Sequence, residues 1–482
     1  MEERVIFEKG RQGRKTNYIK KLSFPLREPK DLIPQQFLRE NLNLSCLGEL
    51  EVIRHYTNLA RRNFSVDANF YPLGSCTMKY NPKINEDLAN LEGFLNLHPY
   101  QEQNCIQGAL EVIRGLEGIL CEITGMKRFS FQASSGAQGE LVGMLMIKKY
   151  HQIKRKKKTR VIIPDSSHGT NPATASMCGY KTLVVESTKG GLIDLNKLSK
   201  LVDDETAAIM LTNPNTLGLF EENILKISEI IHRKGGFLYY DGANFNPLLG
   251  KTSPSLMGFD VIHLNLHKTF STPHGCGGPG AGAVGVRDEL IDFLPLPLVD
   301  YDNNKLYLNY RGKHSIGKVR SFYGNFTVLL KAYIYLLRLG REGLLRAACN
   351  CVINANYIRE KLKNHYEVVF PKCMHEVVFS CVKQKAKGAG SYDIAKRLID
   401  YGIHPPTMYF PLIVKEALMA EPTETESKQT LDYFIQVMID IDREISHTPE
   451  LVKSAPHTMP VKRVDEVRAA RFPDLRWKKN GG

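Results

Sequence analysis

The sequence lacks several features that would place it outside ordinary globular enzymes. Its 482 residues include one tryptophan and no run of about 18 apolar residues, so no membrane-spanning helix is predicted. The N-terminus is charged from its second residue and has no apolar segment, and Glu2, Glu3 and Glu8 argue against an organelle transit peptide. The ten cysteines are scattered without a CxxC pair, so a reducing cytoplasm is the simplest setting.

Acidic residues are outnumbered by basic ones, and the formal net charge is +14. Such a surplus suits a nucleic acid, an acidic protein partner or an anionic substrate. A nucleic-acid role is disfavoured, because the chain has no recognisable reading motif and the densest basic run, residues 154–158, has no interleaved aromatic residues. We interpret this run as a solvated connection between a helix and a strand, with docking of a partner as the alternative.

Apolar strands alternate with amphipathic helices in the middle of the chain. Strands are predicted at residues 160–164, 182–186, 207–212, 237–241 and 260–266. Continuously apolar strands between helices indicate an α/β fold with a mostly parallel sheet that is covered on both faces. We therefore expect an N-terminal arm with an active-site loop over 1–84, a large α/β domain over 85–335, and a smaller α+β domain over 336–482.

Lys268 stands at the exit of the apolar strand 260–266 and is followed by a glycine-rich turn. A lysine is costly to hold at such a position unless it acts, and lysines of this kind form Schiff bases with carbonyl groups, including pyridoxal phosphate. For one lysine considered alone, a side chain that reaches the surface beside a loop is the more ordinary explanation. Residues at the other strand ends must therefore decide between a Schiff-base lysine and an ordinary surface lysine.

A turn of small residues, ASSGAQGE, leads from an earlier strand into a helix. The amides of Gly136, Ala137 and Gln138 point out of the helix start, and the hydroxyl of Ser134 or Ser135 can add a bond, so the turn can bind an anion. The turn matches neither a dinucleotide fingerprint nor a Walker loop, so neither dinucleotide nor ATP is indicated. Ordinary N-capping explains the same residues equally well.

Polar residues also follow three further strands. His168 could lie flat on an aromatic ring, and Asn213 faces the same edge of the sheet. Asp241 ends an apolar strand, where a pyridinium N–H would justify a carboxylate that is otherwise costly to bury; an Asp-Gly turn is the common alternative. Ligands of open parallel sheets bind at the carboxyl ends of the strands. Together, an anion cradle, a ring-stacking histidine, an acid and Lys268 match the functional groups of pyridoxal phosphate.

Several segments resemble glycine dehydrogenase (decarboxylating), the pyridoxal-phosphate-dependent P-protein of the glycine cleavage system. They read FYPLGSCTMKYNPKINE, SSGAQGE, SHGTNPATA, DGANFN, HLNLHKTF and EPTETES. Chain length and the opening segment resemble the separate second (beta) subunit, glycine dehydrogenase subunit 2, of enzymes split into two chains. The resemblance covers the chain from about residue 70 onward and implies a PLP-dependent transferase fold type I, which is aminotransferase-like.

The resemblance also implies roles for individual residues. Lys268 would carry the Schiff base, Asp241 would pair with the pyridine nitrogen, and His168 would stack on the ring. The phosphate would be held by Ser135, Gly136, Ala137 and Gln138. The cofactor would further be lined by Asn213, Ala243 and His267. No metal is predicted.

For the reaction, the resemblance implies that glycine loses carbon dioxide and that its aminomethyl group passes to the lipoyl disulfide of H-protein. The chain would act in the cytoplasm as an oxidoreductase of glycine catabolism, together with glycine dehydrogenase subunit 1 (alpha) in a heterotetramer, without nucleic acid or membrane. Two alternatives stay open. One is another fold type I activity, either an aminotransferase or an amino-acid decarboxylase, and the other is a non-catalytic stabilising subunit.

Three further segments have expectations of their own. Cys276 departs from the GGGGPG run expected of the family, and we expect activity to survive it. Residues 75–79 are expected to fold over the site and to help bind the glycine carboxylate. Residues 416–428 carry four carboxylates, and we interpret them as a solvated connection, with the entrance for the lipoyl arm as the alternative.

Overall fold

The computed structural model describes residues 4–10, 23–39, 44–275 and 280–477, so Cys276 lies outside the described residues. The chain divides into two compact units, one of Met1–Ser65 with Pro456–Gly482 and one of Val66–Ala455. The predicted domain boundaries at 84/85 and 335/336 stay a prediction. Within the described ranges, no helix combines the length and apolar character needed to cross a membrane.

The smaller unit consists of short helices with little core. Its elements are η1 (Ile6–Glu8), α1 (Pro29–Leu32), η2 (Gln35–Phe37), α2 (Glu49–Ala60) and α15 (Glu466–Arg471). Phe7 stacks on Trp477 with ring centroids 5.2 Å apart, which ties the beginning of the chain to its end within this unit.

The larger unit is built on a seven-stranded sheet with the order β1-β7-β6-β5-β4-β2-β3. Its strands are β1 (Arg128–Ser130), β2 (Arg160–Pro164), β3 (Lys181–Val185), β4 (Thr206–Leu211), β5 (Phe237–Asp241), β6 (Val261–Asn265) and β7 (Gly282–Val286). Strand β7 runs antiparallel to β1 and β6, and the other neighbours are parallel. The predicted mostly parallel sheet is confirmed, with strand limits within one residue of those expected.

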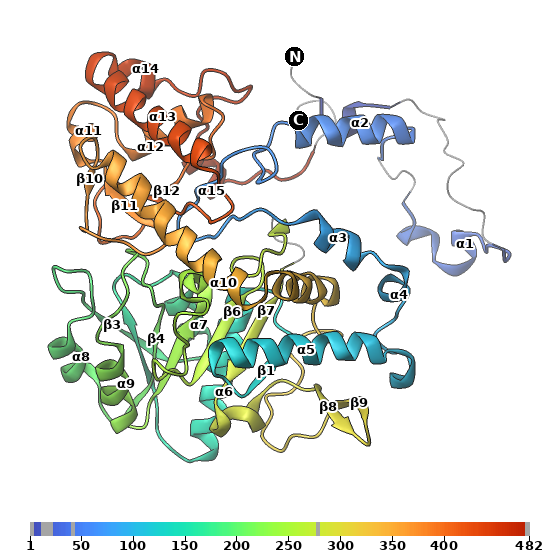
Figure 1. Ribbon diagram of the computed structural model, residues 1–482. Helices are drawn as coiled ribbons and strands as arrows, with labels where there is room; N and C mark the ends of the chain where they lie inside the picture. Colours follow the sequence, from blue (N-terminus) through green and yellow to red (C-terminus); the bar gives the residue numbers. More distant parts are fainter. Residues whose placement is uncertain (1–3, 11–22, 40–43, 276–279, 478–482) are drawn as a thin grey trace. The chain divides into compact units, whose positions relative to one another are not determined.

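Helices cover both faces of this sheet (Figure 1). Apolar side chains of the strands pack against them in two separate clusters. In β4, Ile209 and Leu211 pack in the cluster that includes residues of α5, α8 and α9, whereas Ala208 and Met210 pack in the cluster with α6 and α7. These helices are α5 (Gln107–Thr124), α6 (Gly136–Ile153), α7 (Thr170–Met177), α8 (Leu195–Leu201) and α9 (Ile224–Arg233). Every residue of β4 is buried, as predicted for a continuously apolar strand with both faces covered.

A second, antiparallel sheet of four strands has the order β10-β11-β13-β12. Its elements, with the helices around it, are α10 (Phe326–Leu362), β10 (Glu367–Val368), β11 (Val377–Ser380), α11 (Val382–Ala386), α12 (Ser391–Asp400), β12 (Thr407–Met408), β13 (Ala417–Ala420), α13 (Lys428–His447) and α14 (Pro449–Lys453). The connecting elements are α3 (Lys83–Ala89), α4 (Glu92–Leu95), η3 (Gln103–Cys105), η4 (Gly242–Asn244), η5 (Asn246–Leu248), η7 (Asp288–Phe293), β8 (Leu298–Asp302) and β9 (Lys305–Asn309). The expected α+β character of the C-terminal part is present.

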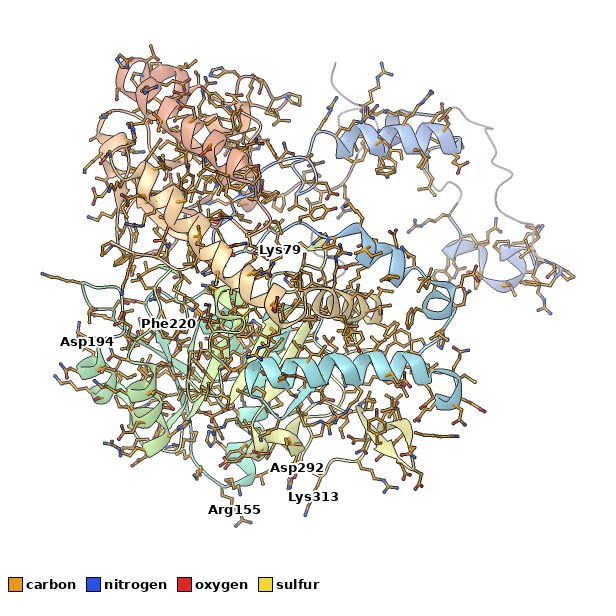
Figure 2. The ribbon with its side chains drawn as sticks, viewed as in Figure 1. Lys79, Arg155, Asp194, Phe220, Asp292 and Lys313 are labelled. Carbon is orange, nitrogen blue, oxygen red and sulfur yellow. The ribbon has the colours of Figure 1, made fainter. Side chains whose placement is uncertain are left out.

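The basic run 154–158 lies between the end of α6 and the start of β2, as predicted. Arg155 is exposed and projects away from the ribbon (Figure 2). Lys157 lies 3.4 Å from Glu205, and the Lys158 ammonium donates to the carbonyl of Lys234. The run is therefore a solvated connection with a few surface contacts.

Candidate active site

The carboxyl ends of the parallel strands surround a cavity of about 400 Å³. Its wall contains most of the residues that the sequence singled out, namely Gly136, Ala137, His168, Asp241, Ala243 and Lys268. It also contains residues that were not singled out, namely Glu140, Gly169, Thr170, His263 and Asn265. The convergence of strand ends expected from the chain order is thus present.

Asp241 is a buried, fully bonded carboxylate at the end of β5. Its Oδ2 accepts from His168 Nδ1 at 2.8 Å and from Asn171 Nδ2 at 3.1 Å, and its Oδ1 accepts from the Ala243 amide at 3.0 Å. Burial raises the pKa of this carboxyl, but His168, His263 and Lys268 more than offset the effect and lower the pKa below its ordinary value. Asp241 is therefore anionic at neutral pH.

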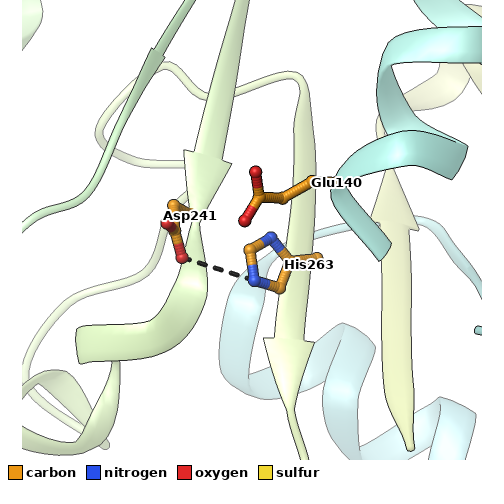
Figure 3. Close-up of side chains that lie close together, drawn as sticks. All are labelled: Glu140, Asp241 and His263. Carbon is orange, nitrogen blue, oxygen red and sulfur yellow. Dashed lines mark ion pairs between the residues drawn. The ribbon is translucent and has the colours of Figure 1, made fainter. Parts of the chain in front are cut away.

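Asp241 belongs to a group that we call the strand-end cluster, formed by Glu140, Asp241 and His263 (Figure 3). His263 Nε2 lies 3.3 Å from Asp241 Oδ1, and its Nδ1 bonds the Tyr239 hydroxyl at 2.8 Å. Glu140 accepts from the Thr170 hydroxyl at 2.7 Å and from Asn171 at 3.0 Å.

The two carboxyls of the strand-end cluster differ in charge. Burial and the charge of Asp241 raise the pKa of Glu140 to about 7, so near neutral pH this carboxyl carries a proton for a large part of the time. Burial also lowers the pKa of His263, which favours the neutral ring. Asp241 thus holds the negative charge of the group.

Ser75 connects Lys268 and His168 to the smaller sheet. Its carbonyl accepts from Lys268 Nζ at 2.9 Å, its hydroxyl bonds His168 Nε2, and its amide donates to Glu376 Oε2 at 2.8 Å. Its φ of 62° lies in the left-handed region, which costs free energy for a residue other than glycine. The expectation that residues 75–79 fold over the site is confirmed, and the role in binding the glycine carboxylate stays a prediction.

Lys79 anchors the other end of the same segment in the interior (Figure 2). Its ammonium bonds Glu424 at 2.5 Å, Asn246 Oδ1 at 2.8 Å, the Thr269 carbonyl at 3.0 Å and the Tyr335 hydroxyl at 3.3 Å. Breaking one partner of a buried pair of this kind costs about 3–5 kcal/mol. The segment is therefore fixed by side-chain bonds at both Ser75 and Lys79.

The start of α6 has the features of an anion site. The Ser135 hydroxyl caps the helix by accepting from the Gln138 amide at 3.1 Å, and the Gln138 side chain accepts from the Ser134 amide and hydroxyl at 2.6 Å. Gly136 and Ala137 line the cavity, and amides in a first helical turn have no acceptor inside the helix, so these two are available to a ligand. A Cβ at Gly136 would collide with the Asn265 amide, which explains the glycine.

Four predicted residues are not part of the cavity wall, namely Ser135 and Gln138 at the start of α6, Asn213, and His267. The Asn213 side chain accepts from the Glu221 amide at 2.9 Å and contacts the Met257 sulfur at 3.4 Å. His267 packs edge-on against His274, and burial beside that ring lowers the pKa of His267 to about 3. The contact of Asn213 and His267 with a cofactor stays a prediction. The phosphate-binding roles of Ser135 and Gln138 also stay a prediction.

A second group, which we call the cross-strand cluster, consists of His375 and Glu376, just before β11, and Glu421, just after β13. Glu421 is 2% exposed and accepts from the Thr77 hydroxyl, and the Glu424 side chain, which pairs with the buried Lys79, is 8% exposed. The interpretation of residues 416–428 as a solvated connection is therefore wrong, because their first part is β13 and two of their carboxylates are buried.

Sequence reasoning missed Glu140, His263 and Glu376. A signal for His263 was present, since a histidine inside the otherwise apolar strand of HLNL must have a polar partner. Glu140 is one turn into α6, and Glu376 immediately precedes the apolar strand β11 of another sheet. Nothing local to either residue indicates that its side chain turns toward Lys268.

The residues of the cavity fit pyridoxal phosphate. Lys268 offers an amine, Asp241 an anionic carboxylate buried in the wall, and Gly136 and Ala137 first-turn amides in that wall, where a Cβ at Gly136 would collide with Asn265. His168 differs from the expected arrangement, because its ring donates to Asp241 and its nearest stacked ring is Phe410, with centroids 6.1 Å apart. The stacking of His168 on a cofactor ring stays a prediction.

Solved structures with the same fold support this description. A glycine decarboxylase (P-protein) of the glycine cleavage system, in inhibitor-bound form, aligns with a TM-score of 0.73 at 20% identity, covering 86% of this chain and 95% of that one. A cysteine desulfurase from Thermococcus onnurineus NA1 aligns with a TM-score of 0.60 at 17% identity, covering 78% and 95%. Residues 137–310 match the family described as Aminotransferase class-V. Fold and site thus define an aminotransferase-like enzyme of fold type I.

Sequence relatives narrow this class. Residues 347–461 match the family described as Glycine dehydrogenase, C-terminal domain. A probable glycine dehydrogenase (decarboxylating) subunit 2 from Caldanaerobacter subterraneus is 55% identical over 478 residues, covering 98% of this chain and 99% of the relative. One from Bacillus licheniformis is 52% identical over 478 residues and covers 98% of this chain. The chain belongs to the glycine dehydrogenase (decarboxylating) subunit 2 family, as its motifs predicted.

Proposed function

We propose that this chain decarboxylates glycine and passes the remaining aminomethyl group to the lipoyl disulfide of an H-protein, using pyridoxal phosphate. Membership of the family supports the reaction, and the single observation that carries the site is the meeting of Lys268 with the anionic Asp241 across one cavity. When bound, pyridoxal phosphate supplies a sink for the electron pair left behind as carbon dioxide departs.

Each residue of the chain then has a distinct task. Lys268 holds the cofactor covalently, and Asp241 stays ionised so that it can hold a proton on the ring nitrogen. His168 orients Asp241 through its 2.8 Å bond, and the start of α6 binds the phosphate. The cofactor contacts proposed for this chain are Lys268, Asp241, His168, Ser135, Gly136, Ala137, Gln138, Asn213, Ala243 and His267.

The segment around Ser75 controls the surroundings of Lys268. Its carbonyl holds the Lys268 ammonium, and Thr77 and Lys79 fix the segment against Glu421 and Glu424. Excluding water at this place strengthens the electrostatic effect of Asp241 on the reacting groups. It also keeps water away from a reactive aminomethyl group until a disulfide arrives.

The names of the relatives support a partner subunit. "Subunit 2" supports a complex with a glycine dehydrogenase subunit 1, which we propose to be a heterotetramer in the cytoplasm. The lipoylated H-protein is the proposed acceptor, because the reaction is a decarboxylation coupled to reduction of a disulfide. The basic run 154–158 is a candidate contact for an acidic acceptor.

Exchange of labelled bicarbonate into glycine tests the reaction. We expect exchange from the chain with subunit 1 and pyridoxal phosphate, strongly increased by lipoylated H-protein. Exchange that ignores H-protein would favour an ordinary amino-acid decarboxylase, and no exchange in any combination would refute the assignment. In a separate test, borohydride should fix the cofactor to the wild-type chain and not to a Lys268→Ala variant.

A further inference from the structure

Two buried carboxylates face each other at the end of the β11–β13 ladder. Val377 pairs with Ala420 in this antiparallel ladder, so the next residues outward on the two strands are Glu376 and Glu421. Both are almost completely buried. Like charges directly opposite one another destabilise a sheet, and burial removes the screening by water. The register therefore forces together two carboxyls that cannot both be ionised there unless a positive charge lies between them.

His375 completes the group with an imidazole that has no bonding partner. It is 0% exposed, and neither of its ring nitrogens has a hydrogen-bond partner among the described residues. Its Nε2 lies 3.9 Å from Glu421 Oε1, and Glu421 Oε2 is likewise buried without a partner. Buried polar atoms in proteins are nearly always paired, so three unpaired atoms in one place indicate a missing ligand.

The neighbouring cations do not neutralise the pair directly. Lys79 bonds Glu424, and Lys268 bonds the Ser75 carbonyl. Among the described residues, the hydrogen-bond donors to the two carboxylates are neutral, namely the Ser75 amide and the Asn244 side chain for Glu376 and the Thr77 hydroxyl for Glu421. The strand-end cluster has the same composition of two carboxyls and one histidine, yet its carboxylate oxygens and both its ring nitrogens are bonded.

We propose that His375, Glu376 and Glu421 bind one divalent first-row transition-metal ion, for which Zn²⁺ is a suitable probe. One ligand atom from each residue lies within 4.8 Å of the other two. Ligand atoms around tetrahedral zinc are about 3.4 Å apart, so small side-chain rotations close the site. One imidazole and two carboxylates suit such an ion, whose charge offsets both carboxylates.

The ion would act as a clamp on the segment that covers Lys268. Glu376 accepts from the Ser75 amide at 2.8 Å and Glu421 accepts from the Thr77 hydroxyl. Fixing the two carboxylates therefore fixes both ends of the turn whose carbonyl holds the Lys268 ammonium. This inference does not depend on the proposed reaction, because metal binding is measured without substrate or partner.

The experiment titrates Zn²⁺ into the full-length chain after treatment with a chelator, in competition with a chromophoric indicator. We expect one tightly bound ion per chain and a Tm that rises with Zn²⁺ concentration, since binding to the folded state alone stabilises it. Glu421→Gln and His375→Gln should lose this ion and the rise in Tm. The matched control Glu140→Gln alters the other cluster and should keep both.

X-ray absorption of the zinc-loaded wild-type chain supplies a second readout that needs no variant. It should show nitrogen and oxygen ligands with an imidazole signature and no sulfur, which separates this site from the cysteines of the chain. Absence of a bound equivalent in the wild type, sulfur ligation, retention of the ion by Glu421→Gln, or its loss in Glu140→Gln would each overturn the proposal.

Discussion

The strand-end cluster and the cross-strand cluster contain the same kinds of residue and differ in how they are surrounded. In the first, Glu140, Asp241 and His263 come from α6, β5 and β6, and neighbouring hydroxyl and amide groups bond them. In the second, an antiparallel register alone brings Glu376 and Glu421 together, and His375 has no hydrogen-bond partner among the described residues. Composition therefore does not decide the chemistry of such a group. The number of available hydrogen-bond partners decides the chemistry. The bonded strand-end cluster holds a fixed negative charge, and the cross-strand cluster offers a set of metal ligands.

Ser75 joins the two clusters. Its hydroxyl bonds His168, which bonds Asp241, and its amide bonds Glu376. A change in either group can therefore reach Lys268 through one residue. Variants that alter one cluster at a time measure how far the two act separately.

The largest expected effect is on catalysis by Asp241→Asn. Removing this charge leaves His168, His263 and Lys268 without the anion that they surround, and exchange of bicarbonate into glycine should fall about a thousandfold. The matched control is Asp260→Asn, a buried carboxylate just before β6 that bonds His232 at 2.8 Å outside the cavity. Its exchange rate per folded molecule should stay near that of the wild type. Equal losses in the two variants would contradict the special role of Asp241.

The next effect is on the pH dependence of stability, measured with Glu140→Gln. Because the folded pKa of Glu140 is raised to about 7, this carboxyl binds a proton more tightly when folded, so its contribution to stability falls as pH rises from about 4.5 through 7. The variant lacks this titration. Relative to the variant, the wild type should lose about 3 kcal/mol of unfolding free energy over that range. Urea unfolding curves at several pH values measure it, and parallel pH profiles would contradict the interpretation.

A smaller effect, with a change of sign, is expected for Glu421→Gln. With a chelator present at pH 8, the variant should be more stable by about 1 kcal/mol, because one of two opposed carboxylates is removed. With Zn²⁺ in excess the order should reverse, since the wild type alone gains binding free energy. Urea unfolding in the two buffers gives both values. The same order in both buffers would show that the cross-strand cluster behaves like the strand-end cluster.

The smallest effect is expected at the residue that joins the clusters. Ser75→Ala should lose about 1 kcal/mol of unfolding free energy with the hydroxyl bond to His168. Ser75→Gly loses the same bond but adopts the φ of 62° without strain, so it should be the more stable of the two variants. Thermal unfolding of both compares them, and an alanine variant as stable as the glycine variant would contradict the strain.

The part of the site that lies on the large sheet could be predicted from the sequence. Lys268, Asp241 and His168 each follow an apolar strand, and the carboxyl ends of parallel strands must meet at one edge. The position of Ser75 could only be inferred from its family motif, and Glu376 and Glu421 could not be placed at all. They reach the site through the packing of a second sheet and a long loop, and neither contact leaves a periodic signal in the chain.

The same contrast explains the error over residues 416–428. Four carboxylates in a short stretch are typical of a solvated surface, and that expectation ignores partners that lie far away in sequence. Thr77 and Lys79, more than 340 positions earlier, bond Glu421 and Glu424 and so offset the cost of burying these carboxylates. Charge patterns thus predict exposure only where no distant counterion is available.

Residues 69–79 are bonded to the smaller sheet and its surroundings, although they come far before that sheet in the chain. Leu73 forms an antiparallel bridge with Ala420, the Phe70 carbonyl accepts from the His404 amide at 3.1 Å, and Lys79 is held by Glu424. The segment therefore joins the smaller sheet through a single β-bridge and side-chain bonds. After a backbone cut between this segment and α3, we expect the N-terminal fragment to stay bound noncovalently, so Lys268 should stay covered. If the two fragments are separated, we expect them to associate again.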